Sequence, residues 1–224
     1  MSLGGLALVG QAAESFGAHP ADESSGCGCL FVALGWLLTR EDGTIAAEKV
    51  TPRQYDRWPE DHRADVEIAD GRAVATAVPS ARRRRAARLI ANALDAAGGS
   101  EWNADVAVEI RLTEAPLTVR RPDVVVYRAD ALDAAPMHAD QVLCVVELVS
   151  SNSLATGRIV GVHRYAQAGI GHYWRIEWSA TGVPVACAYD LDPASQVYQE
   201  HAIQSGLVHV TTPFPVTINL TQLS

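Results

Sequence analysis

The sequence predicts an α/β fold in which a mixed β-sheet is flanked by helices. Three observations support this class. Residues 81–97 repeat apolar side chains at helical spacing, the runs "RPDVVVY" (121–127) and "QVLCVVELVS" (141–150) are short and almost wholly apolar after their first residues, and helical and strand-like segments alternate along the chain. Short apolar runs of this kind are typical of strands buried on both faces, so we place both runs at the centre of the sheet.

Length and composition predict one main domain, residues 49–224, preceded by an extension, residues 1–48. Hydrophobic residues make up 48% of the 224 residues and charged residues 20%, which is ordinary for a globular protein. The extension contains the apolar run "CLFVALGWLL" (29–38) but no sustained helical or strand period. Three interpretations of it stay open: partial disorder, an added strand or helix, or a start codon assigned too far upstream.

Neither a membrane span nor a structural metal is expected from the sequence. The run at 29–38 is shorter than the roughly 20 residues that a spanning helix needs, and no basic flank precedes it. The four cysteines form no C-x-x-C pair, and no histidine is spaced to complete a zinc site. Cys144 and Cys187 lie inside apolar runs, which indicates buried thiols in a reducing compartment, with the cytoplasm as the expected location.

Three elements are expected between residues 50 and 99. Thr51 and Pro52 supply the N-cap and first position of a short helix. The segment "DVEIADGRAVATAV" (65–78) alternates around Asp70-Gly71, which predicts a β-hairpin with a tight turn. Ser80 then precedes an amphipathic helix that Gly98-Gly99 should end.

The rest of the chain predicts strands and one more helix. Strands are expected over "DVAVEIRLTE" (105–114), over the two central runs, and over "HYWRIEW" (172–178), "PVACAYDL" (184–191) and shorter runs to the end. The segment "SLATGRIVGVHRYAQAG" (153–169) indicates a helix. It contains two interior glycines, Gly157 and Gly161, each roughly 1 kcal/mol less favourable than alanine in a helix.

Two carboxylates stand within the apolar strands. Asp123 lies at the entrance of one predicted strand, and Glu147 lies inside the next. A buried ionised carboxylate must be paired, neutral or bound to a cation. If the two converge, one Mg²⁺ ion could satisfy both, because Mg²⁺ prefers oxygen ligands and can activate water for phosphodiester cleavage. The alternatives are that Asp123 caps a turn and that Glu147 forms an ion pair with a nearby arginine.

Four segments carry a resemblance to a known family: "VEIADGRAVATAVPS" (66–80), "RPDVVVY", "VVELVSSNS" (145–153) and "RYAQAGIGHYWRIE" (164–177). Together they resemble the Uma-two family of predicted endonucleases, within the PD-(D/E)XK restriction-endonuclease-like superfamily, from about Thr51 to about Leu191. The resemblance implies a restriction-endonuclease-like mixed sheet flanked by helices and a Mg²⁺-dependent nuclease site. By position, it makes Asp123 and Glu147 the metal ligands and Glu67 an upstream acidic residue of the site.

The sequence also departs from the family. Where the family usually has a proline, an aspartate and a lysine, this chain has Ser151, Gly157 and Gly161, and its one lysine, Lys49, lies outside the resembling region. We therefore expect weakened endonuclease activity. The alternative is a catalytically dead or repurposed nuclease fold that acts as a binding module or on a small molecule.

Two residues near the missing lysine are candidates to replace it. Arg158 stays protonated, so it could stabilise developing charge but could not act as a general base. His163 could accept a proton near neutral pH. For each, the alternative is an ordinary solvated helix residue.

The distribution of charge along the sequence is compatible with DNA as a partner. The net charge of −8 argues against a protein that coats nucleic acid, yet residues 71–128 hold 10 basic and 6 acidic residues. An arginine run at the start of the predicted helix could follow the phosphates of DNA, and its alternative is a solvated polar face. Its members are Arg82, Arg83, Arg84, Arg85 and Arg88. A small-molecule ligand and a homodimer are left open as well.

Overall fold

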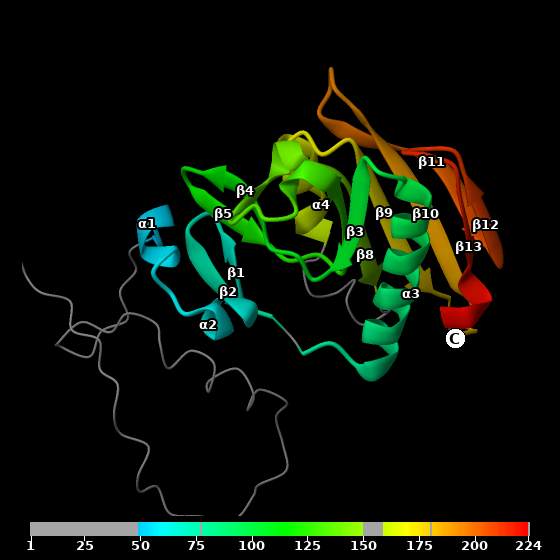
Figure 1. The fold of residues 1–224 in the computed structure, drawn as a ribbon, viewed down its shortest axis with the longest axis horizontal. Coiled ribbons are helices and arrows are strands. Elements are labelled where there is room, and N and C mark those ends of the chain that lie inside the picture. The colour runs from blue at the N-terminus through cyan, green and yellow to red at the C-terminus, as the bar shows by residue number, and fades with distance from the viewer. Residues whose placement is uncertain (1–48, 77, 150–158, 180, 224) are drawn as a thin grey trace, which may run out of the picture.

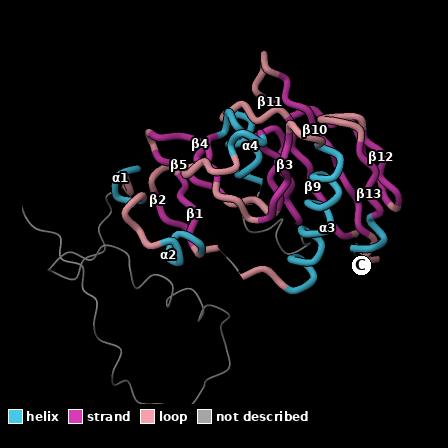
Figure 2. The backbone as a smooth tube through the Cα atoms, viewed as in Figure 1, coloured by secondary structure: helices cyan, strands magenta, loops and turns pink. Residues whose placement is uncertain are grey.

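The computed structural model describes residues 49–223 apart from 77, 150–158 and 180. Helices and strands alternate, and the strands form a five-stranded sheet, a six-stranded sheet and a two-stranded sheet. Figure 1 shows the five-stranded sheet at one end of the molecule and the six-stranded sheet, with helix α3 beside it, at the other. The tube in Figure 2 shows α3 beside the strands of the six-stranded sheet, and α1 and α2 at the end of the molecule that holds β1 and β2. The predicted class, a mixed α/β fold with flanking helices, is confirmed.

The five-stranded sheet has the order β2-β1-β5-β4-β7. Its strands are β1 (Val66–Ala69), β2 (Arg72–Ala75), β4 (Ile110–Glu114), β5 (Leu117–Arg120) and β7 (Met137–His138), and the short helices α1 (Pro52–Tyr55) and α2 (Glu60–Ala64) precede it in the chain. The predicted hairpin is confirmed: β1 and β2 pair antiparallel around Asp70 and Gly71, whose φ angles are 52° and 80°. Thr51 caps α1, as expected.

The six-stranded sheet has the order β11-β10-β9-β8-β6-β3. Its strands are β3 (Trp102–Val106), β6 (Val124–Arg128), β8 (Val142–Val149), β9 (His172–Trp178), β10 (Pro184–Asp192) and β11 (Val197–Ser205). β8 and β9 run parallel, and α4 (Ile159–Gln167) lies between them in the chain, as a parallel crossover requires. The two apolar runs became β6 and β8, both interior strands, so their predicted central place is confirmed.

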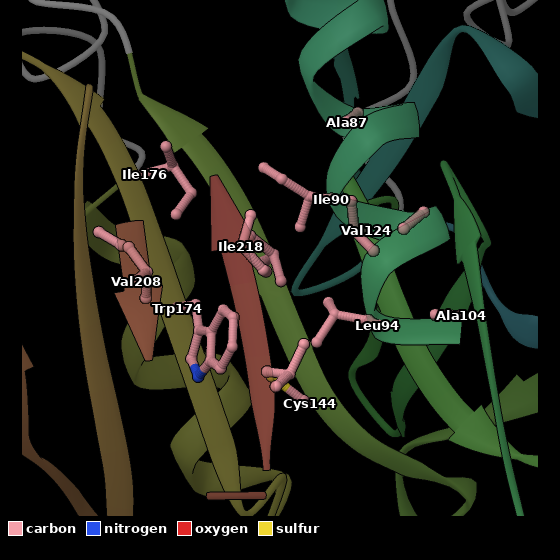
Figure 3. Packing of buried hydrophobic residues seen from close by; sticks show 14 of the residues in the cluster. Ala87, Ile90, Leu94, Ala104, Val124, Cys144, Trp174, Ile176, Val208 and Ile218 are labelled. Atoms are coloured by element: carbon pink, nitrogen blue, oxygen red, sulfur yellow. The ribbon is translucent and has the colours of Figure 1, made fainter. Parts of the chain in front are cut away.

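One face of the six-stranded sheet is covered by α3 (Ala81–Gly98) and by the pair β12 (Leu207–Val210) and β13 (Val216–Asn219). The predicted N-cap is present, since Ser80 Oγ accepts a hydrogen bond from the Arg83 backbone N–H at 3.2 Å. Figure 3 shows Ile90 and Leu94 of α3 directed towards Trp174 of β9 and Ile218 of β13. This packing holds α3 beside β6, with the first turn of the helix near the start of that strand.

The opposite face of the six-stranded sheet packs on α4 and on β4 and β7. Side chains alternate along β6, so Val124 belongs to the α3 side and Val125 to the α4 side. The same alternation along β8 puts Glu147 on the side of Val145, which packs in one cluster with Tyr165 of α4. α4 therefore faces the part of β8 that carries the glutamate.

The structure differs from the sequence prediction between residues 105 and 120. The segment expected as one strand is divided: β3 ends at Val106, Ala107 has a φ of 55°, and β4 begins at Ile110 in the other sheet. β4 and β5 then form a hairpin that was not predicted. An alanine in the left-handed region carries no residue signature of a turn, which is why the pattern read as continuous.

Two further expectations can be checked within the described chain. Cys144 and Cys187 are buried free thiols, as predicted. Among the described residues, no helix is long and apolar enough to cross a membrane. The predicted helix at 153–169 is described only from Ile159, and its first part, including Gly157 and Arg158, lies outside the described residues, as does the extension 1–48.

Candidate functional site

The strand register places Asp123 and Glu147 opposite each other. β6 and β8 pair antiparallel with Val124 opposite Val146, so the next step outward puts Asp123 across from Glu147. Directly opposite side chains on neighbouring strands start roughly 5 Å apart. The backbone N–H of Leu148 donates to Asp123 Oδ2 at 2.7 Å, which ties the residue before β6 to β8. The register therefore puts the two residues at neighbouring positions of β6 and β8.

Arg83 of α3 contacts both carboxylates. Its Nε donates to Asp123 Oδ1 and its Nη2 to Asp123 Oδ2, and the same Nη2 lies 3.9 Å from Glu147 Oε2. The side chains are largely shielded from water, with exposed fractions of 10% for Asp123, 18% for Glu147 and 21% for Arg83. A single guanidinium thus provides positive charge to two nearly buried carboxylates, which lowers the cost of their burial.

Tyr165 holds Glu147 from the α4 side. Its hydroxyl donates to Glu147 Oε1 at 2.9 Å, and its side chain is buried. Burial, followed by the negative charges of Glu147 and Glu67, keeps the pKa of Tyr165 well above its ordinary value of 10. The phenol therefore stays protonated near neutral pH and acts as a hydrogen-bond donor to the glutamate.

Glu67 of β1 lies next to the segment that leads into Asp123. It accepts hydrogen bonds from Arg120 Nη1 at 2.7 Å and from the Arg121 backbone N–H at 3.0 Å. Its charge also acts on Tyr165. The contacts of Glu67 with Arg120 and Arg121 fix the chain immediately before Asp123.

A second ion pair joins the hairpin to α4. Arg164 Nη1 donates to Asp70 Oδ1 at 2.6 Å, and Arg164 Nη2 donates to Asp70 Oδ2. The hydrogen bond from Arg164 is the largest cause that lowers the pKa of Asp70 below 3.8. Because Arg164 directly precedes Tyr165, this pair holds α4 against the sheet that carries Glu67.

The other predicted site residues are dispersed. Arg82, Arg84, Arg85 and Arg88 are exposed on α3, where Arg82 lies over the ring of Trp178 with 5.2 Å from its guanidinium carbon to the ring centre. Unlike these four arginines, Arg83 is directed to Asp123.

Of the two candidates to replace the lysine, the structure describes His163 alone. His163 is exposed on α4. It comes two residues before Tyr165, and at 3.6 residues per turn the two side chains leave the helix roughly 160° apart. Arg158 lies outside the described residues.

Comparison with known proteins identifies the family. Residues 52–221 match the Uma2 family model, which is described as "Putative restriction endonuclease". The chain belongs to the Uma2 family. The resemblance inferred from the sequence is therefore confirmed for most of the chain. A search of curated proteins found no match.

A solved structure similar to this Uma2 chain shares its fold. It is a crystal structure described as a "putative nuclease belonging to DUF820" from Anabaena variabilis, and it is 12% identical in sequence. The similarity covers 78% of this chain and 97% of that chain, with a TM-score of 0.57. At this identity the comparison shows the common fold alone.

The donor atoms of this candidate site suit a hard divalent cation, but Arg83 is in contact with them. Among the described residues, no group of three or more histidine, cysteine, aspartate or glutamate side chains is arranged to hold a metal. Mg²⁺ needs only one or two carboxylates, with water and substrate oxygens completing its shell, so Asp123 and Glu147 fit in kind and number. Both oxygens of Asp123 accept hydrogen bonds from Arg83, so a metal ion there would require this side chain to move.

The sequence did not predict that Arg83 and Tyr165 contact the two carboxylates. Arg83 was grouped with its exposed neighbours, although an arginine partner for Glu147 was one of the alternatives. The N-cap Ser80 places Arg83, three residues later, in the first turn of α3. That position distinguishes the residue only in part, because Arg82 lies in the same turn. The sequence predicts no role for Tyr165, and nothing in the sequence alone pairs it with Glu147.

Proposed function

We propose that this Uma2 protein is a weak, Mg²⁺-dependent endonuclease that hydrolyses phosphodiester bonds in DNA, with Asp123 and Glu147 as the metal ligands. The observation that carries the proposal is the convergence of these two carboxylates, from adjacent interior strands, on one guanidinium nitrogen. Two ionised carboxylates that lie together in a position shielded from water require a cation beside them, because their burial and mutual repulsion are otherwise unfavourable. Membership of the Uma2 family supports a nuclease reaction at that position.

The chain's own residues would orient the site. The Leu148 N–H fixes the direction of Asp123, and the Tyr165 hydroxyl fixes Glu147. When bound, Mg²⁺ would polarise the phosphate and lower the pKa of a water molecule. The exposed arginines of α3 begin one residue from Arg83 and would give a DNA backbone favourable contacts beside the carboxylates.

The proposed weakness follows from the missing lysine. A positioned ammonium stabilises the charge that develops on the phosphate, and loss of one such donor typically costs on the order of 10² to 10³ in rate. Position 161, where the family has that lysine, is a glycine here. Lys49, the one lysine of the chain, lies beside the hairpin turn, where its charge acts on Asp70.

A plasmid-cleavage assay with a parallel binding measurement tests this function. We expect slow, Mg²⁺-dependent nicking of supercoiled plasmid that EDTA stops and that Asp123→Asn and Glu147→Gln each abolish. Asp130→Asn is the matched control, because Asp130 is exposed and pairs only locally with Arg128. The proposal fails if the wild-type protein neither nicks plasmid nor binds Mg²⁺ in calorimetry.

A second candidate, a DNA-binding module without hydrolysis, is favoured by one observation. The guanidinium of Arg83 already satisfies Asp123 without a metal. This candidate predicts DNA binding that EDTA leaves unchanged and that Arg84→Gln with Arg85→Gln weakens, with no cleavage under any metal condition. The first candidate instead predicts cleavage that depends on the metal.

Compartment and assembly extend the proposal. The buried free thiols of Cys144 and Cys187 support a reducing compartment such as the cytoplasm. A homodimer is a further proposal, because two copies of the site would allow cleavage of both DNA strands. Analytical ultracentrifugation with and without DNA would test it.

A further inference from the structure

Arg83 has a different environment from every other arginine of its run. The side chains of Arg82, Arg84, Arg85 and Arg88 are exposed, whereas Arg83 makes two hydrogen bonds to Asp123 and approaches Glu147. Its backbone N–H is anchored on Ser80, so the start of its side chain is fixed. The long side chain beyond that anchor has several rotatable bonds and can adopt more than one direction.

We propose that Arg83 is the resident counter-ion of the Asp123–Glu147 pair and competes with Mg²⁺ for it, so that metal binding expels the guanidinium towards a phosphodiester group. This inference rests on the proposed metal site and adds the regulation of that site. The same oxygens cannot be fully coordinated by Mg²⁺ and hydrogen-bonded side-on by a guanidinium. Arg83 must therefore leave Asp123 for the metal to bind fully.

Formal charge indicates where the guanidinium goes. Asp123 and Glu147 carry two negative charges, which one Mg²⁺ neutralises, and Arg83 retained beside them would leave one positive charge in excess. A phosphodiester carries one negative charge and accepts the two-pronged hydrogen bonding that Arg83 now makes with Asp123. The two carboxylates, the metal ion, the guanidinium and the phosphodiester together carry no net formal charge.

The neighbouring arginines oppose release of Arg83 when DNA is absent. An outward movement would bring its charge closer to Arg82, Arg84 and Arg85, which share the same helical turn and are exposed. Like charges a few ångströms apart repel each other, and they also oppose the positive end of the helix dipole. A polyanion removes this penalty, so Mg²⁺ and DNA phosphate should assist each other's binding.

The test is the affinity for Mg²⁺ alone, measured by isothermal titration calorimetry on the full chain. Arg83→Gln removes the charge and keeps a polar side chain of moderate length. Arg83→Lys is the matched control, because it keeps the charge. We expect Arg83→Gln to bind Mg²⁺ about tenfold or more tightly than wild type and Arg83→Lys to remain close to wild type. Thermal melting supplies the second readout, in which Mg²⁺ should raise the Tm of Arg83→Gln more than that of wild type.

The outcomes separate this inference from the proposed function. If the wild type binds Mg²⁺ and Arg83→Gln binds it equally or more weakly, competition by Arg83 is wrong while the metal site stands. If neither protein binds Mg²⁺, both are wrong. Should Arg83→Gln fail to fold, Arg83→Met replaces it and is compared with Arg83→Lys. Competition by the charge predicts that the methionine variant binds Mg²⁺ more tightly than wild type and that the lysine variant does not.

Discussion

Tyr165 on α4 donates its hydroxyl to Oε1 of Glu147 on β8, with 2.9 Å between the two oxygens. α4 is the helix of the crossover between the parallel strands β8 and β9. The bond therefore ties this helix to the strand that precedes it in the chain. Its donor is fully buried and retains its proton well beyond pH 10. The orientation of Glu147 therefore depends on a group that does not titrate in the physiological range.

Removal of this hydroxyl should destabilise the protein. We predict that Tyr165→Phe lowers the free energy of unfolding by about 2 kcal/mol, because a hydrogen bond to a charged acceptor is worth roughly 1.5 to 3 kcal/mol. Tyr198→Phe is the control, since its hydroxyl donates to the neutral carbonyl oxygen of Ile170 and should cost about 1 kcal/mol. Urea unfolding measures both, and an equal or smaller loss for Tyr165→Phe would contradict the role assigned to it.

Restoring the family lysine should raise DNA cleavage. Position 161 precedes Tyr165 by one helical turn on α4, so a lysine there would leave the helix on the same face, towards Glu147. We predict that Gly161→Lys increases plasmid nicking on the order of 10²-fold. It should also stabilise α4 by up to about 1 kcal/mol, because glycine is a poor helix former.

The matched control for this gain is Gly161→Ala. It supplies the same backbone stabilisation without the ammonium, so it should raise the Tm and leave the cleavage rate unchanged. Equal cleavage by the lysine and alanine variants would show that the missing ammonium is not what limits the reaction. Cleavage by wild type as fast as by Gly161→Lys would direct attention to Arg158 and His163.

Residues 1–48 should be dispensable for folding of the domain. The family match begins at residue 52, and Val50 is buried and donates its N–H to the Gly71 carbonyl at 2.7 Å, so a chain of residues 49–224 keeps that contact. We predict unfolding within about 0.5 kcal/mol of the full chain in urea. An insoluble or molten product would contradict this and give the extension a structural role.

A shorter chain beginning at Asp56 provides the contrast. It lacks Val50 and also Tyr55, which is fully buried and donates its hydroxyl to Glu109 at 2.8 Å. Loss of a buried aromatic residue costs about 3 kcal/mol or more. This chain should therefore be clearly less stable than the one that begins at Lys49.

The Asp70–Arg164 pair should make stability depend on acid pH. The pKa of Asp70 lies below 3.8 in the folded protein, chiefly because of the hydrogen bond from Arg164. A lowered carboxyl pKa contributes stability that is present above pH 3.8 and is lost as the pH falls through the folded value. Asp70→Asn should thus destabilise the protein at pH 7, and the difference from wild type should shrink as the pH falls below 3.8.

The size of this effect is limited by solvent. Asp70 is 51% exposed, so the pair should contribute no more than about 1 kcal/mol. Asparagine also tolerates the positive φ at this position, so the turn itself should survive the change. Asp130→Asn, which breaks a pair within two residues of sequence, should alter stability less. A difference between wild type and Asp70→Asn that is constant from pH 3 to 7 would refute the coupling.

The sequence predicted those parts of the fold whose signals are local. The Asp70-Gly71 turn, the Ser80 cap and the two apolar runs at 121–127 and 141–150 each depend on neighbouring residues, and the structure confirms all of them. The division of 105–114 between two sheets was not predictable, because it depends on Ala107 adopting a positive φ. Tertiary contacts, rather than residue preference, impose that conformation.

The candidate site was predictable only for its acidic members. Asp123 and Glu147 could be identified because carboxylates in apolar strands need compensation, and their facing register followed from adjacent strands. The sequence could not identify Arg83 as the group that compensates their charge. Among five arginines in one short segment, helix packing alone determines that Arg83, and not Arg82 or Arg84, reaches the carboxylates.

A crystal structure of the wild-type protein grown with Mn²⁺, a substitute for Mg²⁺ that is visible by its anomalous scattering, tests the central claim most directly. We predict one anomalous peak bonded to a carboxylate oxygen of Asp123 and of Glu147 at about 2.2 Å, with Arg83 displaced from Asp123. Arg83 still hydrogen-bonded to Asp123, with no peak between the carboxylates at millimolar Mn²⁺, would contradict the metal site and leave a structural ion pair in its place.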